Sequence, residues 1–409
     1  MTVHWYSDPE PDDGERVAKA FREAYGRDPD GLWAAPGRVN VVGEHVDYQA
    51  GLCLPFALPQ RTIAAVAVRD DDELHLRSAQ FPDPGAAWSG RPGDIGPGRI
   101  RGWAGYAAGV SWALREAGRS VPGLDVLVDS TVPVGAGLSS SAALECAVAL
   151  AVDELAGLGL AADDAGRARL AAACVRAENE IAGAPTGGLD QAAALRSRAG
   201  HTLLLDCRDF TVRQVPFDLP HAGLELLVID TRAHHALVDG QYGSRRDTCS
   251  AACELLGVRA LRDISPEALP DALARIATAV DDATRTDGLA RATRHVVGEI
   301  ERVRQVVRLL EAGRVREIGP VLDASHASLR DDYAVSCVEL DVACDTARGA
   351  GALGARMTGG GFGGSAIALV ISAEANRVAR AVTTAFVDRG WPAPAFLRAV
   401  PAAPGGRIG

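Results

Sequence analysis

The sequence predicts an α+β fold built from two domains. A chain of 409 residues is longer than one simple hydrophobic core usually accommodates, which favours two domains. Strand-like segments occur toward both ends of the chain, whereas the part from about residue 244 to 350 is predominantly helical. Strands, then a run of helices, then strands again indicate an α+β architecture rather than regular βαβ winding. We place the boundary between residues 190 and 220, and we expect domains over 1–205 and 206–409.

The first half mixes strands with helices. Residues 61–68 and 73–78 have the pattern of strands, and the run of aspartates between them, Asp70 to Asp72, indicates a solvated hairpin turn. Residues 124–130 form another strand, which ends at a glycine-rich turn. Beyond it we expect two helices and then two strands, over about 140–157, 165–182, 201–206 and 211–217.

The second half opens with a strongly apolar strand over residues 224–231 (LELLVIDT). After the helical part, residues 365–372 and 395–400 have the aliphatic composition of strands and bracket one further helix. The chain contains neither an internal repeat nor a low-complexity linker.

Charge and hydropathy argue against several kinds of partner. The formal net charge of −11 disfavours a broad surface for nucleic acid or for an anionic membrane. No basic region followed by an apolar one opens the sequence, so we expect no secretory signal. The longest apolar stretch, residues 142–166, is interrupted by Glu145, Asp153 and Glu154, and it therefore predicts a buried helix rather than a membrane span. We expect a monomer that binds neither nucleic acid nor membrane.

The eight cysteines are scattered and include no C-x-x-C pair. Cys249 and Cys253 lie four residues apart on an expected helix, where ordinary buried thiols are far more common than a metal site. This usage is typical of a reducing compartment, and we expect the cytoplasm.

The segment PVGAGLSSSAALE, residues 133–145, has the composition of a phosphate-binding loop. Gly135 and Gly137 let the backbone turn its N–H groups outward without a Cβ in the way. The serines that follow begin a helix, whose free N–H groups and positive dipole end favour a polyphosphate. Ser140 and Ser141 add hydroxyls that can reach phosphate oxygens or Mg²⁺.

A plain glycine-rich turn, with Ser139 as the helix N-cap, is the alternative interpretation of this segment. The familiar nucleotide motifs are missing, because the chain has no G-x-x-x-x-G-K-[ST] and its single lysine, Lys19, lies far from any glycine-rich loop. P-loop NTPases and protein kinases both use a lysine at the phosphates, so the sequence argues against both classes.

A second glycine-rich loop, GARMTGGGFGG over residues 354–364, contains a G-x-G-x-x-G at Gly359, Gly361 and Gly364. The dinucleotide fingerprint requires a helix after these glycines, but the segment that follows is strand-like. The glycines therefore indicate a close approach of the backbone to a ligand or to another loop.

Polar side chains crowd together near the N-terminus. Arg38, Glu44, His45 and Asp47 lie within ten residues and alternate with valines. A ligand rich in hydroxyls needs this mixture of donors and acceptors, because each buried hydroxyl must be paired. A surface cluster of ion pairs explains the same residues equally well.

A third constellation, ENEIAGAPTGGLDQ over residues 178–191, presents two acids. Glu178 lies at the end of one expected helix and Asp190 at the start of the next. Glu178 could hold Mg²⁺, and Asp190 could accept a hydroxyl proton. A helix N-cap is the alternative role for Asp190.

Taken in order, the polar cluster, the serine-bearing loop and the late glycine-rich loop resemble the three signature motifs of the GHMP kinases. Residues 37–48 closely resemble the galactokinase signature G-R-V-N-x-x-G-E-H-x-D-Y. The stretches RHVVGEI, SLRDDYAVSCVELD and DGQYGSRR also resemble members of that family, so the likeness covers nearly the whole chain.

This resemblance implies two α+β domains with the active site in the cleft between them, where ATP phosphorylates galactose at its anomeric hydroxyl. Asp190 and Arg38 would then be the catalytic residues. The sugar would be bound by Glu44, His45, Asp47, Gly187 and Tyr242. The magnesium ion that accompanies ATP would be bound by Ser141 and Glu178. The nucleotide would be bound by Gly135, Ala136, Gly137, Leu138, Ser139, Ser140, Ser141 and, near the adenine, Trp103.

Two departures from the family pattern are visible. Val46 stands where threonine is more usual, and T-G-G-L-D-Q replaces C-G-I-M-D-Q, a change that could adjust the shape of the sugar pocket. Two alternative functions stay open: a related sugar kinase for N-acetylgalactosamine or arabinose, and a non-catalytic galactose sensor. An intact phosphate loop, together with Glu178 and Asp190, favours an enzyme over a sensor.

Overall fold

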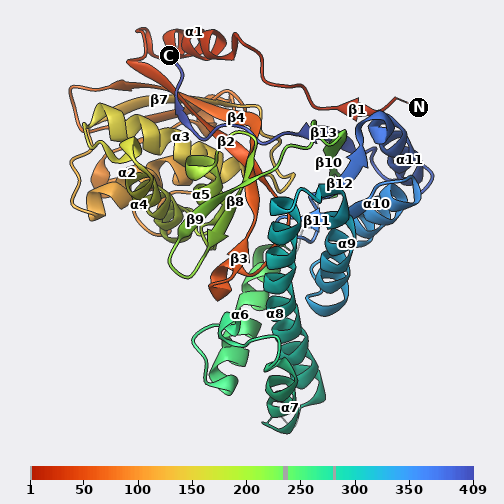
Figure 1. Cartoon of the computed structure of the whole chain (residues 1–409). Coiled ribbons are helices and arrows are strands. Elements are labelled where there is room, and N and C mark those ends of the chain that lie inside the picture. The colour runs from red at the N-terminus through yellow and green to blue at the C-terminus, as the bar shows by residue number, and fades with distance from the viewer. Residues whose placement is uncertain (1, 234–237, 280–281) are drawn as a thin grey trace.

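The computed structural model describes residues 2–233, 238–279 and 282–409, and it has two halves that meet along a central core (Figure 1). The first half, red to yellow in Figure 1, holds most of one large sheet, and the last third, in blue, holds most of another. Between them in the sequence, three helices extend away from both sheets as an arm, formed by α6 (Val238–Leu256), α7 (Leu269–Ala279) and α8 (Ala283–Glu311).

The sheet of the first half has alternating side chains that face two separate layers of helices. Along β4 (Pro55–Val68), Ala64 and Val66 pack against α2–α4, whereas Ile63 and Ala65 pack against α1. The strand order is β14 (Gly406–Arg407), β2 (Gly31–Asn40), β4, β7 (Leu124–Ser130), β5 (Leu74–Ser78) and β6 (Trp88–Gly90). The helices are α1 (Asp13–Tyr25), α2 (Ala104–Glu116), α3 (Ser140–Leu155), α4 (Asp164–Arg176) and α5 (Leu189–Arg196).

The hairpin expected between residues 61–68 and 73–78 is wrong, although both segments are strands. Strand β7 lies between them: it pairs antiparallel with β4, Thr62 opposite Ser130, and parallel with β5, Leu74 opposite Leu124. Alternating side chains indicate a strand but not its partner, and the partner here comes from about fifty residues further along the chain.

The helix expected over 165–182 is confirmed, but it changes character at its end. The α-helical part α4 ends at Arg176, and Ala177–Ala182 form a π-helical turn that contains Glu178. Such a turn shifts the following side chains around the helix axis, and π turns occur frequently at functional sites. Here the turn faces the start of α5, which carries Asp190.

The sheet of the last third has five strands, of which one comes from the N-terminus and one from residues 224–230 in the middle of the chain. The order is β1 (His4–Trp5), β13 (Ala395–Ala399), β10 (Leu224–Asp230), β12 (Ser365–Ile371) and β11 (Gly354–Thr358). Residues 354–358, expected as part of a loop, are therefore a strand, whereas the glycines after Thr358 do form the loop. Three helices accompany this sheet, namely α9 (Gly319–Ala327), α10 (Val338–Gly349) and α11 (Ala375–Val387).

A three-stranded sheet lies at the junction of the two halves, with the order β3 (Leu52–Cys53), β8 (His201–Asp206) and β9 (Thr211–Pro216). The largest hydrophobic cluster also spans this junction, because it joins Val41 near β2, Val303 on α8 and Ile367 on β12. Apolar burial therefore holds the halves together and fixes the polar loops between them.

The domain division at residue 205 stays a proposal. It falls inside β8, and both ends of the chain cross it, since β1 joins the sheet of the last third and β14 joins the sheet of the first half. Across the ranges described above, no helix combines the length and the apolar character that crossing a membrane requires.

Candidate active site

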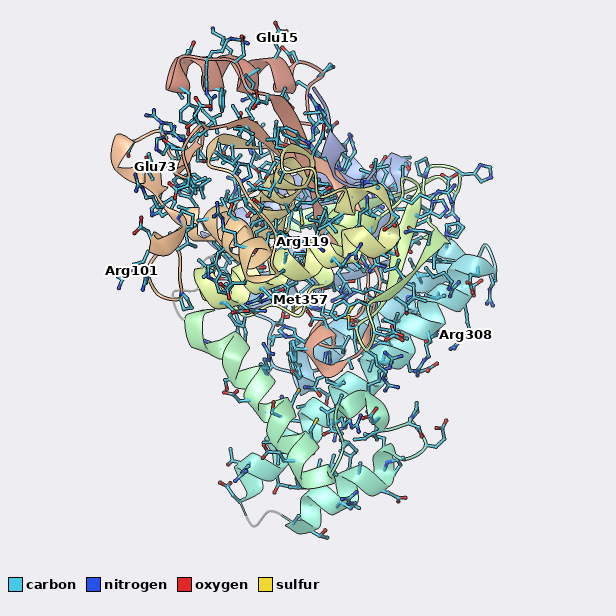
Figure 2. All side chains as sticks on the ribbon, turned by 90° about the vertical axis from the view of Figure 1, so that its left-hand side faces the viewer. Glu15, Glu73, Arg101, Arg119, Arg308 and Met357 are labelled. Atoms are coloured by element: carbon cyan, nitrogen blue, oxygen red, sulfur yellow. The ribbon has the colours of Figure 1, made fainter. Side chains whose placement is uncertain are left out.

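A polar cavity of about 140 Å³ lies where the loops of the two halves meet. Figure 2 places Met357, the buried β11 residue that precedes the late glycine loop, near the middle of the molecule, whereas Glu15 and Arg308 lie at its periphery. Four predicted residues from the N-terminal cluster and two predicted acids line the cavity together. The lining consists of Arg38, Glu44, His45, Asp47, Glu178, Pro185, Thr186, Leu189, Asp190, Gly359 and Gly360.

Arg38, near the end of β2, and Asp190, in the first turn of α5, form a bidentate ion pair. The guanidinium donates through Nε to Oδ1 at 2.8 Å and through a terminal nitrogen to Oδ2 at 3.0 Å. A planar fork of this kind fixes the orientation of both groups. The hydroxyl of Ser139 also donates to Asp190. Asp190 is not an N-cap, because Gly188 occupies that position.

Ser139 occupies the N-cap position of α3 but does not cap the helix. Its backbone has φ 61° and ψ 48°, in the left-handed region, and its side chain makes no capping hydrogen bond. The hydroxyl is directed to Asp190 instead. Ser139 was predicted as a nucleotide contact, and the structure brings its hydroxyl to Asp190, the predicted proton acceptor. A left-handed serine is uncommon and costs conformational energy, which is typical of functional loops.

The predicted phosphate loop is the serine-bearing loop within residues 133–145, and hydrogen bonds to its carbonyl groups fix its position. The carbonyl of Ala136 accepts from the Ser365 hydroxyl at 2.6 Å, and that of Gly137 accepts from Arg38 at 2.7 Å. Because a helix leaves its first N–H groups without intrahelical acceptors, the start of α3 retains donors for an anion. The side chains of Ala136 and Leu138 are buried in the core, so these two predicted residues can offer only backbone groups.

The late glycine loop packs directly on the phosphate loop. A Cβ at Gly359 would lie 3.0 Å from the carbonyl oxygen of Gly137, and Gly359 has φ 83°. Both the left-handed conformation and the small space favour glycine here. The expected close approach of backbone to another loop is confirmed.

A second cavity, of about 290 Å³ and mostly apolar, adjoins the start of α3. Trp103 lines it together with Tyr106, Phe81 and Leu144, and its indole nitrogen donates to the carbonyl of Ala86 at 3.0 Å. Ser140 and Ser141 line the same cavity. A flat apolar ligand in this cavity would therefore reach the phosphate loop at its edge.

Glu178 lies behind the phosphate loop in a setting that is short of positive charge. Burial and the nearby Asp190 raise the pKa of Glu178 to about 7, although hydrogen bonds from Ser141 and Gln191 oppose this shift. A divalent cation would relieve the electrostatic strain, and one carboxylate with one hydroxyl is a suitable oxygen donor set for Mg²⁺. No group of three or more His, Cys, Asp or Glu side chains gathers at a metal site within the described part of the chain. Mg²⁺ here would depend on few protein ligands and on the phosphates of a nucleotide.

Asp47 follows a sharp turn and faces the cavity, with Gly187 pressed against it. Burial raises the pKa of Asp47 to about 6, and Asp190 and Glu44 add to that shift. A Cβ at Gly187 would lie 2.2 Å from the Oδ2 atom of Asp47, so a side chain at Gly187 would displace this carboxylate. Gly187 therefore shapes the predicted sugar site through Asp47.

Glu44 and His45 join the N-terminal cluster to the late glycine loop. The Oε1 atom of Glu44 accepts from the Thr358 hydroxyl at 3.0 Å and from the backbone N–H of Gly359 at 2.8 Å. His45 has φ 57°, and its ring nitrogens meet the Tyr48 hydroxyl at 2.9 Å and the Gly360 carbonyl at 3.0 Å. Burial lowers the pKa of His45 to about 3, which keeps the ring neutral.

Two residues that the sequence analysis did not single out support this loop from α8. Glu299 accepts from the backbone N–H of Gly43 at 2.9 Å, and His295 lies 3.1 Å from the carbonyl oxygen of Glu44 through Nε2. Both side chains are fully buried. Their stretch, RHVVGEI, was noted for its family resemblance, but nothing local in it indicates contact with a loop some 250 residues earlier.

Tyr242, the remaining predicted sugar contact, lies in α6, and its side chain is outside the part of the chain that the structure describes. Its role stays a prediction.

Three family models match the chain. Residues 19–68 match the galactokinase galactose-binding signature, residues 105–198 the N-terminal domain of GHMP kinases, and residues 306–388 the C-terminal domain of GHMP kinases. These matches contain the N-terminal polar cluster, the serine-bearing loop with both acids, and the late glycine loop, respectively.

Several relatives are similar over nearly their full length. The galactokinase of Streptomyces coelicolor is 51% identical over 96% of this chain and 98% of its own. The galactokinase of Bos taurus is 40% identical over 90% and 92%. The solved structure of Lactococcus lactis galactokinase complexed with galactose has a TM-score of 0.88 and 29% identity, covering 96% of this chain and 99% of that one.

More distant structures share the fold alone. A mevalonate kinase has a TM-score of 0.61 at 13% identity and covers 92% of this chain and 98% of its own. Because the relatives that resemble this chain far more strongly are galactokinases, and because the family models agree with them, the chain belongs to the galactokinase family of the GHMP kinases.

Proposed function

We propose that this enzyme transfers the γ-phosphate of ATP to the C1 hydroxyl of galactose and forms galactose 1-phosphate. The observation that carries the proposal is the position of Asp190. Its carboxylate lines the polar cavity and at the same time accepts from Ser139 at the start of the phosphate-loop helix. A sugar hydroxyl beside Asp190 would therefore meet a nucleotide held by that helix.

The polar cavity has the chemistry that a sugar requires. Asp47 and Asp190 offer acceptors, and Arg38 offers donors, so that several hydroxyls can be paired at once. One carboxylate oxygen of Glu44, Oε1, already accepts from Thr358 and Gly359, and both ring nitrogens of His45 meet protein groups. We therefore assign Glu44 and His45 chiefly to the walls of the site, and we assign Asp47 and Asp190 to the sugar hydroxyls.

Transfer then depends mainly on position and charge, since phosphoryl transfer has a loose transition state. Asp190 orients the C1 hydroxyl and accepts its proton as the oxygen attacks phosphorus. Arg38 keeps Asp190 in place and contributes positive charge close to the transferred group. Mg²⁺, which Ser141 and Glu178 would hold, neutralises phosphate charge when it is bound. We place the adenine in the apolar cavity beside Trp103.

A coupled assay that follows ADP release with a panel of sugars tests this proposal. We expect turnover with galactose that requires Mg²⁺, and NMR should identify the product as galactose 1-phosphate. Faster turnover with N-acetylgalactosamine or arabinose would identify a related sugar kinase instead. Galactose binding without turnover in the presence of Mg-ATP would identify a sensor.

We also place the enzyme in the cytoplasm as a monomer. All eight cysteines are free thiols and seven of them are buried, which suits a reducing compartment. Light scattering at several protein concentrations measures the oligomeric state directly.

A further inference from the structure

A second buried acid, Glu145, lies behind Glu178, and one glutamine connects the two. Glu145 is on α3 and Gln191 is on α5, and both are 0% exposed. The amide nitrogen of Gln191 donates to Glu145 Oε2 at 3.0 Å and to Glu178 Oε2 at 2.6 Å. Both N–H groups of the amide are thereby used, one for each acid.

Two oxygens of this cluster have no hydrogen-bond partner within the described residues, namely Oε1 of Glu145 and Oε1 of Gln191. Buried polar atoms are usually paired, and two orphan acceptors on groups that already touch each other need a common explanation. An ionised Glu145 has no proton to give and cannot resolve the conflict. A neutral carboxylic acid resolves it completely, because an O–H at Oε1 supplies the one missing donor for the amide oxygen.

The opposite orientation of the Gln191 amide does not remove the problem. It would set the single amide oxygen against both acids, and the Glu178 carboxylate would lose the N–H donor that it now has. In the present orientation a neutral Glu145 offers an O–H to the amide oxygen, and the amide keeps both of its acceptors. Burial and the charge of Glu178 both raise the pKa of Glu145 well above its usual range, in agreement with the hydrogen-bond argument.

We propose that Glu145 and Gln191 are positioning residues for phosphoryl transfer: the acid and the amide form a doubly hydrogen-bonded pair, whose remaining N–H holds the Glu178 carboxylate beneath the phosphate loop. The pair connects two helices, since Glu145 follows the phosphate loop on α3 and Gln191 adjoins Asp190 on α5. It therefore sets the spacing between the nucleotide-binding helix and the helix of the catalytic acid. This proposal rests on the proposed kinase function, in which Glu178 holds Mg²⁺.

Amide and apolar substitutions separate this role from simple packing. In Glu145→Gln, two amides can still exchange two hydrogen bonds, so the pair survives without any acid. In Glu145→Leu and Gln191→Leu the pair is lost, although burial is kept. Glu154→Gln, an exposed position on the same helix, is the matched control for an acid-to-amide change.

Calorimetry with Mg²⁺ and a non-hydrolysable ATP analogue gives a readout that does not depend on turnover. We expect Glu145→Gln and Glu154→Gln to keep the wild-type affinity within about threefold. Glu145→Leu and Gln191→Leu should weaken it by about 10- to 100-fold, the usual range for residues that orient a metal ligand. The KM for galactose should change little, whereas kcat should fall with the nucleotide affinity.

Infrared spectroscopy of the ligand-free protein near pH 9, above the pKa of about 7 of Glu178, tests the acid form of Glu145 directly. A carbonyl band of a neutral carboxylic acid should be present in the wild type and in Glu154→Gln, and Glu145→Gln should lose it. The proposal is overturned if that band is missing from the wild type, if Glu145→Gln binds as weakly as Glu145→Leu, or if Glu145→Leu binds normally. If the wild type phosphorylates no sugar while these bands and affinity ratios hold, the proposed function fails and the positioning role stands.

Discussion

Two glutamates of this enzyme, Glu299 and Glu145, are equally buried but differ in the hydrogen-bond donors and charges around them. Glu299 lies beneath the loop that carries Glu44 and His45. It accepts from the Gly43 backbone at 2.9 Å, from Ser325 at 2.7 Å and from Arg302 at 2.6 Å. Glu145, beneath the phosphate loop, accepts from Gln191 alone among the described groups. Both side chains are 0% exposed, so burial itself does not distinguish them.

Their pKa values move in opposite directions because their neighbours differ in charge. Burial raises the pKa of any carboxyl, but Arg302 and Arg356 outweigh that effect and lower the pKa of Glu299. Next to Glu145 lies another acid, Glu178, which adds to the effect of burial. Glu299 is thus compensated by arginines of the protein itself, whereas Glu145 and Glu178 lie together where a bound cation would compensate the negative charge.

The sharpest way to break this comparison is the Glu299→Gln substitution. It removes the negative charge that Arg302 and Arg356 face, and we expect the free energy of unfolding at pH 7 to fall by about 3 kcal/mol. The folded pKa of Glu299 is lowered, so its stabilisation is present above the unfolded pKa and is lost as pH falls. The deficit measured by urea unfolding should therefore shrink at acid pH.

Glu301→Gln, two positions away on the same helix and partly exposed, serves as its control and should cost less than about 1 kcal/mol. Glu145→Gln, by contrast, should leave stability nearly unchanged. Equal decreases in the free energy of unfolding for Glu299→Gln and Glu145→Gln would show that the two acids do not differ in ionisation.

The next largest effect is expected at Asp190, which lies between the polar cavity and the start of the phosphate-loop helix. Asp190→Asn removes the proposed proton acceptor but keeps the shape of the side chain, so kcat should fall by at least about a hundredfold while galactose affinity is largely kept. Steady-state kinetics together with calorimetry measure both quantities. Near-normal turnover would remove Asp190 from the role of proton acceptor.

Asp47 differs from Glu299, although both acids belong to the side of the site predicted to bind the sugar. The pKa of Asp47 is raised to about 6. Its carboxylate faces the cavity and forms no ion pair with the residues that the structure describes, so we expect a sugar hydroxyl to be its partner. Asp47→Ala should weaken galactose binding by about tenfold, corresponding to one hydrogen bond to a charged group. Unchanged affinity by calorimetry would remove Asp47 from the sugar contacts.

The smallest effect concerns the ligand-free protein and depends on pH. Glu178 has a folded pKa of about 7, above its unfolded value, so its ionisation costs stability as pH rises from about 4.5 to 7. In the presence of EDTA, Glu178→Gln should therefore be more stable than the wild type at pH 8, by about 1–2 kcal/mol. That advantage should disappear near pH 5. A variant that is less stable at pH 8 would show that Glu178 is already compensated without a cation.

Local patterns predicted most of the strands and helices, but not how the strands pair. Residues 61–68 and 73–78 are strands as expected, yet β7 separates them, because side-chain alternation carries no information about the partner strand. The π turn at Glu178 was missed for a related reason. Its i+5 hydrogen bonds leave no periodic signature in six residues.

The motifs predicted polar residues that the structure brings together, since one cavity is lined by Arg38, Glu44, His45, Asp47, Glu178 and Asp190. They did not predict Ser139 as a partner of Asp190, because a serine that precedes a helix is ordinarily read as a cap. The supporting residues Glu145, Gln191, His295 and Glu299 were also missed. Their function depends on what they face, and each lies in an ordinary helical sequence.

By itself, the sequence determined the class of fold, the kinase family and the residues able to do chemistry, because glycine, serine and acid residues at set spacings encode local backbone and functional groups. Only the tertiary structure decided which acids are ionised. That property depends on the charges and donors packed around each carboxyl, and those come from segments far apart in the chain. Glu299 and Glu145 have the same side chain and the same burial, and only their neighbours differ.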